Sequence, residues 1–133
     1  SIPLLGWDGY DKEIYENTRK HLLSKSNQVY YEGQEFRGIG SPHTPSQYIW
    51  PMAMVIQGLT EDEPDRDAKM AFQLRQLLLS ATNDAMHESV HQDDHRTFTR
   101  VWFEWVSLTT LLLLFHAFLS QSWLELTVMI RQM

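Results

Sequence analysis

The sequence contains no cysteine, no glycine after Gly58 and no cluster of basic residues. The absence of cysteine excludes disulfide bonds and thiolate metal sites. The net charge of −6, with no basic cluster, argues against nucleic acid or an anionic membrane surface as a partner. The first residues include neither an initiator methionine nor a basic segment followed by a long apolar stretch. No signal peptide is therefore visible, the localisation stays open, and the opening resembles the interior of a longer protein.

Long hydrophobic runs are scarce. The strongest candidate, residues 106–119, has 14 residues and includes two Thr, one Ser and His116. A membrane-spanning helix needs about 20 consecutive apolar residues. The run therefore favours a buried helix over a membrane anchor, and we do not expect a membrane partner.

Hydrophobic residues are nonetheless plentiful. They make up 43% of the 133 residues, and 12% of the chain is aromatic. A chain of this length and composition predicts one domain with its own core and excludes a disordered chain. Nothing in the sequence predicts an oligomeric state.

The first half of the chain predicts two helices separated by a loop. Asp11 can cap a helix that ends near Ser24, and its apolar positions recur at helical spacing. Residues 25–43 hold three Gly and one Pro, which predicts a loop with a short extended piece at 29–31. A second helix is expected from Thr44, with Pro45 in the first turn, a kink at Pro51 and an end near Gly58. Its expected buried face consists of Ile49, Ala53 and Ile56.

The second half predicts two more helices. One begins in the acidic cluster at 61–65, where carboxylates complement the helix dipole. The other begins at Thr99, with Phe98 and Phe103 stapling its first turn. No strand pattern of comparable strength appears, so the prediction is an all-α fold. The expected apolar face of the third helix is Ala71, Leu74, Leu78 and Ala81.

Two loops carry residues able to bind ligands or transfer protons. In Met-His-Glu-Ser at 86–89, Glu88 can take a proton from water, and His87 can bond a sugar hydroxyl. In the glycine-rich loop at 38–43, small residues let a ligand approach while Ser41 and His43 offer hydrogen bonds. The alternative is structural: a solvated His-Glu pair in a connection, and glycines that only form turns.

The second loop also fits a zinc-protease pattern, because His87, Glu88 and His91 satisfy H-E-x-x-H. That chemistry requires both imidazoles on one face of a helix. A helix through this polar run would have little to bury, and the glycine of the longer metzincin motif is absent. A zinc peptidase is therefore a weaker alternative, with Asp93, Asp94 or His95 as third ligand.

Five segments together resemble one family, the metal-independent α-mannosidases of glycoside hydrolase family 125. They lie at residues 16–24, 30–33, 38–50, 86–89 and 98–105, in a similar order and spacing. The resemblance covers about residues 3–106, and the pairing of 38–50 with 86–89 is its most specific part.

The resemblance implies an (α/α)6 barrel, of which residues 1–133 would form the C-terminal part of a single catalytic domain, with 107–133 as a divergent tail. Members of the family, fungal proteins among them, are exo-acting, inverting hydrolases. They remove non-reducing terminal α-1,6-linked mannose without metal or cofactor. The implied partner is an α-mannoside oligosaccharide, such as an N-glycan or a mannoprotein glycan. The four or five helices of this chain cannot close a barrel of twelve. We therefore expect uncovered apolar faces and an inactive isolated chain.

For the site, the resemblance implies that Glu88 acts as general base. An inverting enzyme needs a second carboxyl group roughly 6.5–9.5 Å away. The family's acid is an Asp upstream of anything in this sequence, so we nominate no acid. Ser41, His43, His87 and Arg100 are candidates for holding the terminal mannose. Residues 80–85 depart from the family's Gly-rich approach to this motif, which keeps a non-catalytic helical interaction module open as a third possibility.

Overall fold

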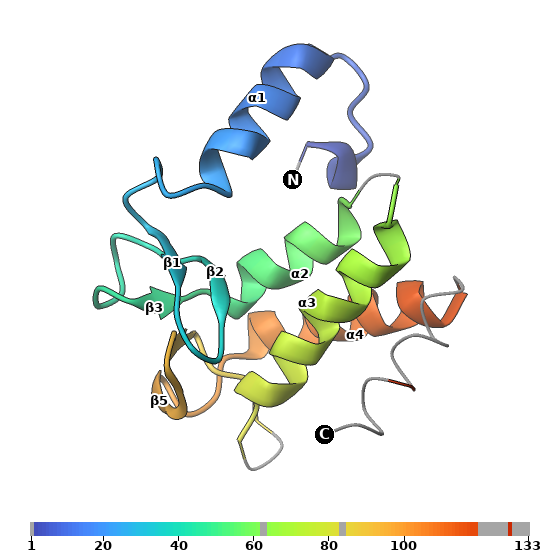
Figure 1. Cartoon of the computed structure of the whole chain (residues 1–133). Helices are drawn as coiled ribbons and strands as arrows, with labels where there is room; N and C mark the ends of the chain where they lie inside the picture. The colour runs from blue at the N-terminus through green and yellow to red at the C-terminus, as the bar shows by residue number, and fades with distance from the viewer. Residues whose placement is uncertain (1, 62–63, 83–84, 120–127, 129–133) are drawn as a thin grey trace.

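The computed structural model describes residues 2–61, 64–82, 85–119 and 128. These residues include a 3-10 turn at Pro3–Leu5, four α-helices and five short strands (Figure 1). The helices are α1 (Lys12–Leu22), α2 (Pro51–Leu59), α3 (Arg66–Ser80) and α4 (Glu104–Leu119). The strands are β1 (Tyr30–Glu32), β2 (Arg37–Ile39), β3 (Tyr48–Ile49), β4 (Ser89–His91) and β5 (Asp94–Thr99).

The all-α prediction is wrong for two regions of the chain. β1 and β2 pair antiparallel, and β3, β4 and β5 form a separate antiparallel sheet with β4 in the centre. The strands gather on one side of α2, α3 and α4 (Figure 1). Four of these five strands have only two or three residues, too few to show a clear alternation, and β3 pairs with a strand far away in the sequence.

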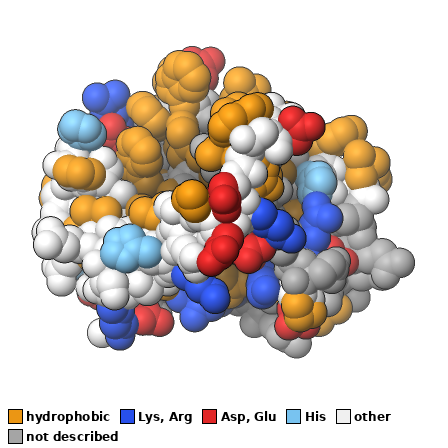
Figure 2. Space-filling view, turned by 90° about the horizontal axis from the view of Figure 1, so that it is seen from above, with side chains coloured by type: hydrophobic (Ala, Val, Ile, Leu, Met, Phe, Trp, Pro, Cys, Tyr) orange, Lys and Arg blue, Asp and Glu red, His pale blue; other side chains and the backbone are white. Residues whose placement is uncertain are grey.

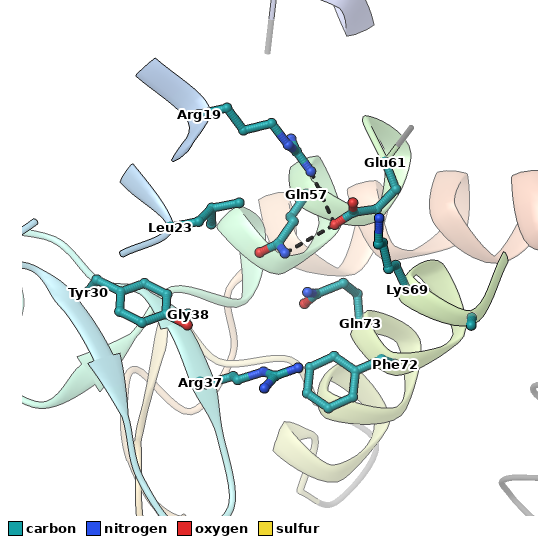
Figure 3. Close-up of a pocket in the computed structure, with 11 residues that line it drawn as sticks. Arg19, Leu23, Tyr30, Arg37, Gly38, Gln57, Glu61, Lys69, Phe72 and Gln73 are labelled. Carbon is teal, nitrogen blue, oxygen red and sulfur yellow. Dashed lines mark hydrogen bonds and ion pairs between the residues drawn. The ribbon is translucent and has the colours of Figure 1, made fainter. Parts of the chain in front are cut away.

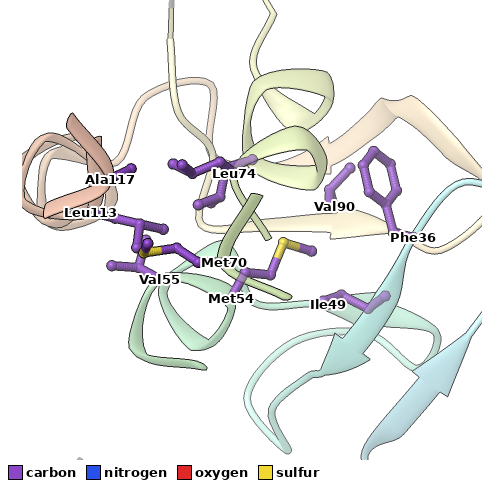
Figure 4. Close-up of a cluster of buried hydrophobic side chains, with 10 residues drawn as sticks. Phe36, Ile49, Met54, Val55, Met70, Leu74, Val90, Leu113 and Ala117 are labelled. Atoms are coloured by element: carbon purple, nitrogen blue, oxygen red, sulfur yellow. The ribbon is translucent and has the colours of Figure 1, made fainter. Parts of the chain in front are cut away.

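The core lies where α2, α3 and α4 pack together and meet the strands (Figure 4). Aliphatic and sulfur-containing side chains dominate it, and Phe36 fills the end next to the sheet. Burial of such side chains is the main stabilising contribution in a domain of this size. The buried cluster consists of Phe36, Ile49, Met54, Val55, Met70, Leu74, Leu77, Val90, Leu113 and Ala117.

The predicted start of the second helix is wrong. Thr44 and Pro45 form turns, with the Thr44 N–H donating to the Ser41 carbonyl, and α2 begins only at Pro51. Pro51 occupies the first helical turn rather than a kink, since a proline there loses no hydrogen bond. Ile49 is fully buried, as expected, but on β3, where it pairs with Val90. The buried positions of α2 are Pro51, Met54, Val55 and Gly58, whereas Ala53 and Ile56 of the expected face are only partly buried.

The predicted start of the last helix is also wrong. Thr99 is the last residue of β5, and α4 begins at Glu104. The polar run before it forms a β4–β5 hairpin in which Phe98 pairs with Val90, so Phe98 packs on the sheet instead of stapling a helix.

Two helical predictions are confirmed. The Asp11 carboxylate accepts a hydrogen bond from the Ile14 N–H at 3.0 Å and caps α1. α3 follows the acidic cluster and buries Ala71 and Leu74, although Leu78 lies at the surface.

Many large hydrophobic side chains are exposed among the described residues. Those on α4 are Trp105, Leu108, Leu111, Leu112, Phe115, Phe118 and Leu119. Figure 2 shows hydrophobic side chains at the surface of one face of the molecule, beside a group of acidic and basic ones. Within the described part of the chain, no helix has the length and hydropathy to cross a bilayer.

Candidate functional site

Glu88 lies at the point where the loop after α3 enters β4. Its carboxylate is 3.3 Å from Arg100 Nε and accepts a hydrogen bond from the Thr99 hydroxyl at 3.2 Å. The Glu88 side chain is 20% exposed, so the carboxylate is held in place but reachable from solvent. Sequence reasoning did not identify Thr99 as a contact of Glu88.

Thr99 is itself oriented by a buried hydroxyl. The Ser89 and Thr99 hydroxyl oxygens are 2.6 Å apart, and Ser89 is fully buried. If Thr99 donates to Glu88, Ser89 donates to Thr99, because each hydroxyl has one proton. The hydrogen-bond chain therefore runs from Ser89 through Thr99 to the carboxylate.

Arg100 occupies an unusual backbone conformation beside Glu88. Its φ is 49°, in the left-handed region that non-glycine residues seldom adopt. Its guanidinium lies 5.6 Å from the centre of the Phe103 ring, and its side chain is 64% exposed. Strained residues of this kind persist where the surrounding contacts enforce them, and they concentrate at functional sites.

His87 supplies one of those enforcing contacts. The His87 ring is fully buried and stacks on Phe98, with ring centres 3.5 Å apart. Its Nδ1 lies 3.2 Å from the Arg100 carbonyl oxygen, and its Nε2 lies 2.6 Å from the Thr82 hydroxyl. An Nδ1–H that donates to the carbonyl leaves Nε2 to accept from Thr82. Both nitrogens are thus engaged within the protein, and the imidazole holds the turn that carries Arg100.

Ser41 and His43 form a separate cluster. The Ser41 hydroxyl is nearly buried and accepts a hydrogen bond from the His43 backbone N–H at 3.2 Å. The His43 side chain is exposed. Among the described residues, no hydrogen bond or ion pair links either residue to Glu88. The structure therefore brings Glu88, His87 and Arg100 together and leaves Ser41 and His43 on a neighbouring loop.

The glycine of this loop is required by close packing. A side chain at Gly40 would collide with the Tyr48 carbonyl oxygen and the Tyr31 ring. Gly40 also donates its N–H to the Val29 carbonyl, and the Trp50 N–H donates to Ile39. The glycine thus lets the loop lie against β3 at the entrance to α2.

The geometric premise of the zinc alternative is wrong. His91 lies on β4, so the H-E-x-x-H residues do not share a helix face. His87 uses both ring nitrogens in hydrogen bonds, and His91 Nδ1 accepts from the Asp93 N–H. Across the described residues, no three His, Asp or Glu side chains converge as metal ligands would.

This chain is similar to a family model, to a curated protein and to solved structures. The family model for metal-independent alpha-mannosidase (GH125) matches residues 1–111. The Meiotically up-regulated gene 157 protein of Schizosaccharomyces pombe is 38% identical over 108 residues, which cover 80% of this chain and 21% of that protein.

One of the similar solved structures is a metal-independent alpha mannosidase of Streptococcus pneumoniae in a non-productive complex with alpha-1,6-mannobiose. It is 39% identical, with a TM-score of 0.78, over 86% of this chain and 26% of that one. The chain thus spans about a quarter or less of the length of these relatives.

Proposed function

We propose that this chain, which belongs to the metal-independent α-mannosidase family GH125, contributes the general base of an exo-α-1,6-mannosidase. The observation that carries the proposal is the environment of Glu88: a partly exposed carboxylate held by Arg100 and Thr99. The substrate class follows from likeness to a relative whose solved complex contains alpha-1,6-mannobiose.

Glu88 is suited to activating water. A general base needs an acceptor oxygen fixed within hydrogen-bond reach of the water it deprotonates. Arg100 and Thr99 both engage the Oε2 oxygen. The Oε1 oxygen is then the one that would face a water aimed at the anomeric carbon.

Arg100 and His87 have different roles in this proposal. Arg100 is exposed and can bond mannose hydroxyls with the guanidinium N–H groups that Glu88 does not use. His87 is buried and acts on the sugar only through Arg100, as a positioning residue. Ser41 shapes the neighbouring loop, and His43, which that loop exposes, is the candidate there for bonding the sugar.

The reaction proposed is hydrolysis with inversion. One carboxylate deprotonates water on one face of the sugar, while a carboxylic acid protonates the leaving oxygen roughly 6.5–9.5 Å away. The acid would come from elsewhere in an (α/α)6 barrel to which α2, α3 and α4 contribute.

The test is hydrolysis of α-1,6-mannobiose by the protein expressed from its complete gene, with and without EDTA. NMR of the first product identifies the anomer, and an inverting enzyme releases β-mannose from an α-linkage. We expect activity that chelation does not change and that Glu88→Gln lowers by about 10²- to 10⁴-fold.

The matched control is Glu35→Gln. Glu35 is also a partly exposed carboxylate held by a basic partner, His95, at 2.9 Å. We expect this variant to retain activity. No turnover by the wild-type protein would favour the non-catalytic interaction module, while α-mannose as first product would contradict inversion.

A further inference from the structure

A cavity of about 490 Å³ opens between α1, the β1–β2 hairpin, α2 and α3 (Figure 3). Its volume lies within the range of about 300–1,000 Å³ typical of small-molecule sites. None of the residues assigned to the mannosidase site lines it. The side chains that matter for its chemistry are Arg19, Arg37, Lys69, Glu61, Gln57 and Gln73.

The charged side chains that line this cavity leave a positive excess. Three basic residues and one carboxylate line it, so three positive charges against one negative leave +2. Glu61 lies 3.1 Å from Arg19 Nη2 and accepts a hydrogen bond from Gln57 at 3.1 Å. The single carboxylate is therefore already committed to Arg19. The charges of Arg37 and Lys69 remain, in a chain whose net charge is −6.

Arg37 is held in position before any ligand arrives. Its guanidinium lies over the Phe72 ring, 4.4 Å from the ring centre. Its backbone N–H donates to the Gln76 amide oxygen at 2.8 Å. A planar guanidinium fixed in this way loses little side-chain freedom when it pairs with an oxyanion.

Neutral hydrogen-bond donors also line the cavity. Gln76 donates to the Gln73 amide oxygen at 3.1 Å, which leaves the Gln73 NH2 group as the end available to a ligand. A tyrosine hydroxyl is protonated at neutral pH, and burial raises the pKa of Tyr30 further, so this hydroxyl can donate as well. Lys69 uses one ammonium N–H on the Pro64 carbonyl and keeps two others.

We propose that this cavity binds the phosphate or carboxylate group of a small anionic molecule, with Arg37 and Lys69 as its charged ligands. Guanidinium, ammonium and amide donors around one hollow match the several acceptor oxygens of such a group. The site is independent of the mannosidase proposal, because it needs neither Glu88 nor hydrolysis.

The experiment is isothermal titration calorimetry of the protein with inorganic phosphate and, separately, with citrate. Sodium chloride keeps the ionic strength constant, since screening weakens exposed charge interactions. We expect saturable binding of at least one anion. In the double variant Arg37→Gln and Lys69→Gln, the dissociation constant should rise at least about fivefold, in keeping with the loss of charge-assisted hydrogen bonds.

The matched control is Lys12→Gln with Arg96→Gln, which removes the same two positive charges from exposed positions outside the cavity. It should bind as the wild type does. The single variant Lys69→Gln, at an exposed position, repeats the test without disturbing the Arg37–Phe72 contact.

Each outcome of these titrations supports or overturns the proposed anion site. Binding of phosphate alone identifies phosphorylated ligands, and binding of citrate alone identifies carboxylates. Equal weakening in the control pair, or no saturable binding of either anion, would overturn the site. Because Glu88→Gln should leave anion binding unchanged, failure here stays distinguishable from failure of the mannosidase proposal.

Discussion

Two Arg–Glu ion pairs lie toward opposite ends of α2. They have the same chemical groups but differ in exposure. Arg19 and Glu61 meet at 3.1 Å beyond the end of the helix, with side chains only 21% and 8% exposed. Arg100 and Glu88 meet at 3.3 Å near its start, with side chains 64% and 20% exposed. The β3–β4 pairing that joins Ile49 to Val90 brings the Glu88 end of β4 toward the first turn of the helix.

The difference in exposure indicates that the Arg19–Glu61 pair stabilises the fold, while the Arg100–Glu88 pair is available to a ligand. The Arg19–Glu61 pair ties α1 to the end of α2, and Thr60 adds a hydrogen bond to Arg19 at 2.8 Å. A buried pair cannot lose one partner without leaving an uncompensated charge. An exposed pair contributes little to stability. In the proposed function, the strained backbone at Arg100 serves to place this pair against the sugar.

The largest expected effect is loss of activity in Glu88→Gln. General acid–base groups typically contribute about 10²- to 10⁴-fold to rate, so we expect a fall of that size in kcat. Urea unfolding should change by less than about 1 kcal/mol, because Arg100, the charged partner of Glu88, is 64% exposed. A stability loss as large as the activity loss would remove the distinction between the two pairs.

The converse is expected of Glu61→Gln. Removing the carboxylate leaves Arg19 without its charged partner, so we expect destabilisation by about 3 kcal/mol in urea unfolding. Mannobiose hydrolysis by the folded protein should stay near the wild-type rate. Glu32→Gln is the matched control, because its pair with Lys25 is exposed on both sides, and it should shift stability by less than about 0.5 kcal/mol.

A smaller effect, on stability, tests whether the backbone at Arg100 is strained. Arg100→Gly and Arg100→Gln both remove the guanidinium, and both should lower activity. Only glycine adopts φ of 49° without strain, so the glycine variant should be more stable than the glutamine variant by about 1 kcal/mol. Thermal and urea unfolding of the two variants provide the measurement. Equal stability would mean that the turn at Arg100 stores no strain.

The smallest effect concerns a third pair, Arg96 with Asp94, on the β5 surface. The hydrogen bond from the Arg96 side chain, with another from its backbone N–H, lowers the pKa of Asp94 from 3.8 to about 2. A carboxyl whose pKa is lower in the folded state stabilises the fold above its unfolded pKa. This contribution is therefore complete above about pH 3.8 and is lost as the pH falls through about 2.

NMR titration of the Asp94 carboxyl measures this midpoint. In Arg96→Gln the midpoint should move back toward 3.8, though not fully, because the backbone N–H remains. An unchanged midpoint would contradict the assignment of the shift to the Arg96 side chain.

The local sequence predicted the features that depend on neighbouring residues. Asp11 caps the helix that it immediately precedes, and the acidic cluster precedes α3, because capping and dipole effects act within one turn. Glu88 emerged from a motif of adjacent residues, and the family resemblance implied its role. The sequence did not predict that Thr99 donates a hydrogen bond to Glu88, because that contact depends on the register of the β4–β5 hairpin.

The extended piece expected at 29–31 overlaps β1, but the other strands were not predicted, for a related reason. Tyr48 and Ile49 become β3 only because His91 and Val90 offer them backbone partners. The residue types at Thr44 and Pro45 are as common in turns as at helix starts. The pairing of β3 with β4 decided that they form a turn rather than a helix start.

By itself, the sequence determined the α1 and α3 helices, the apolar content of the core and the motif that holds Glu88, since each depends on interactions between near neighbours. Only the tertiary structure decided that His87 is buried with its ring against the Arg100 carbonyl, that β4 and β5 form a hairpin before α4, and that Arg37 and Lys69 line one cavity. These arrangements join residues that are distant along the chain, and their energies arise only when folding brings the partners together.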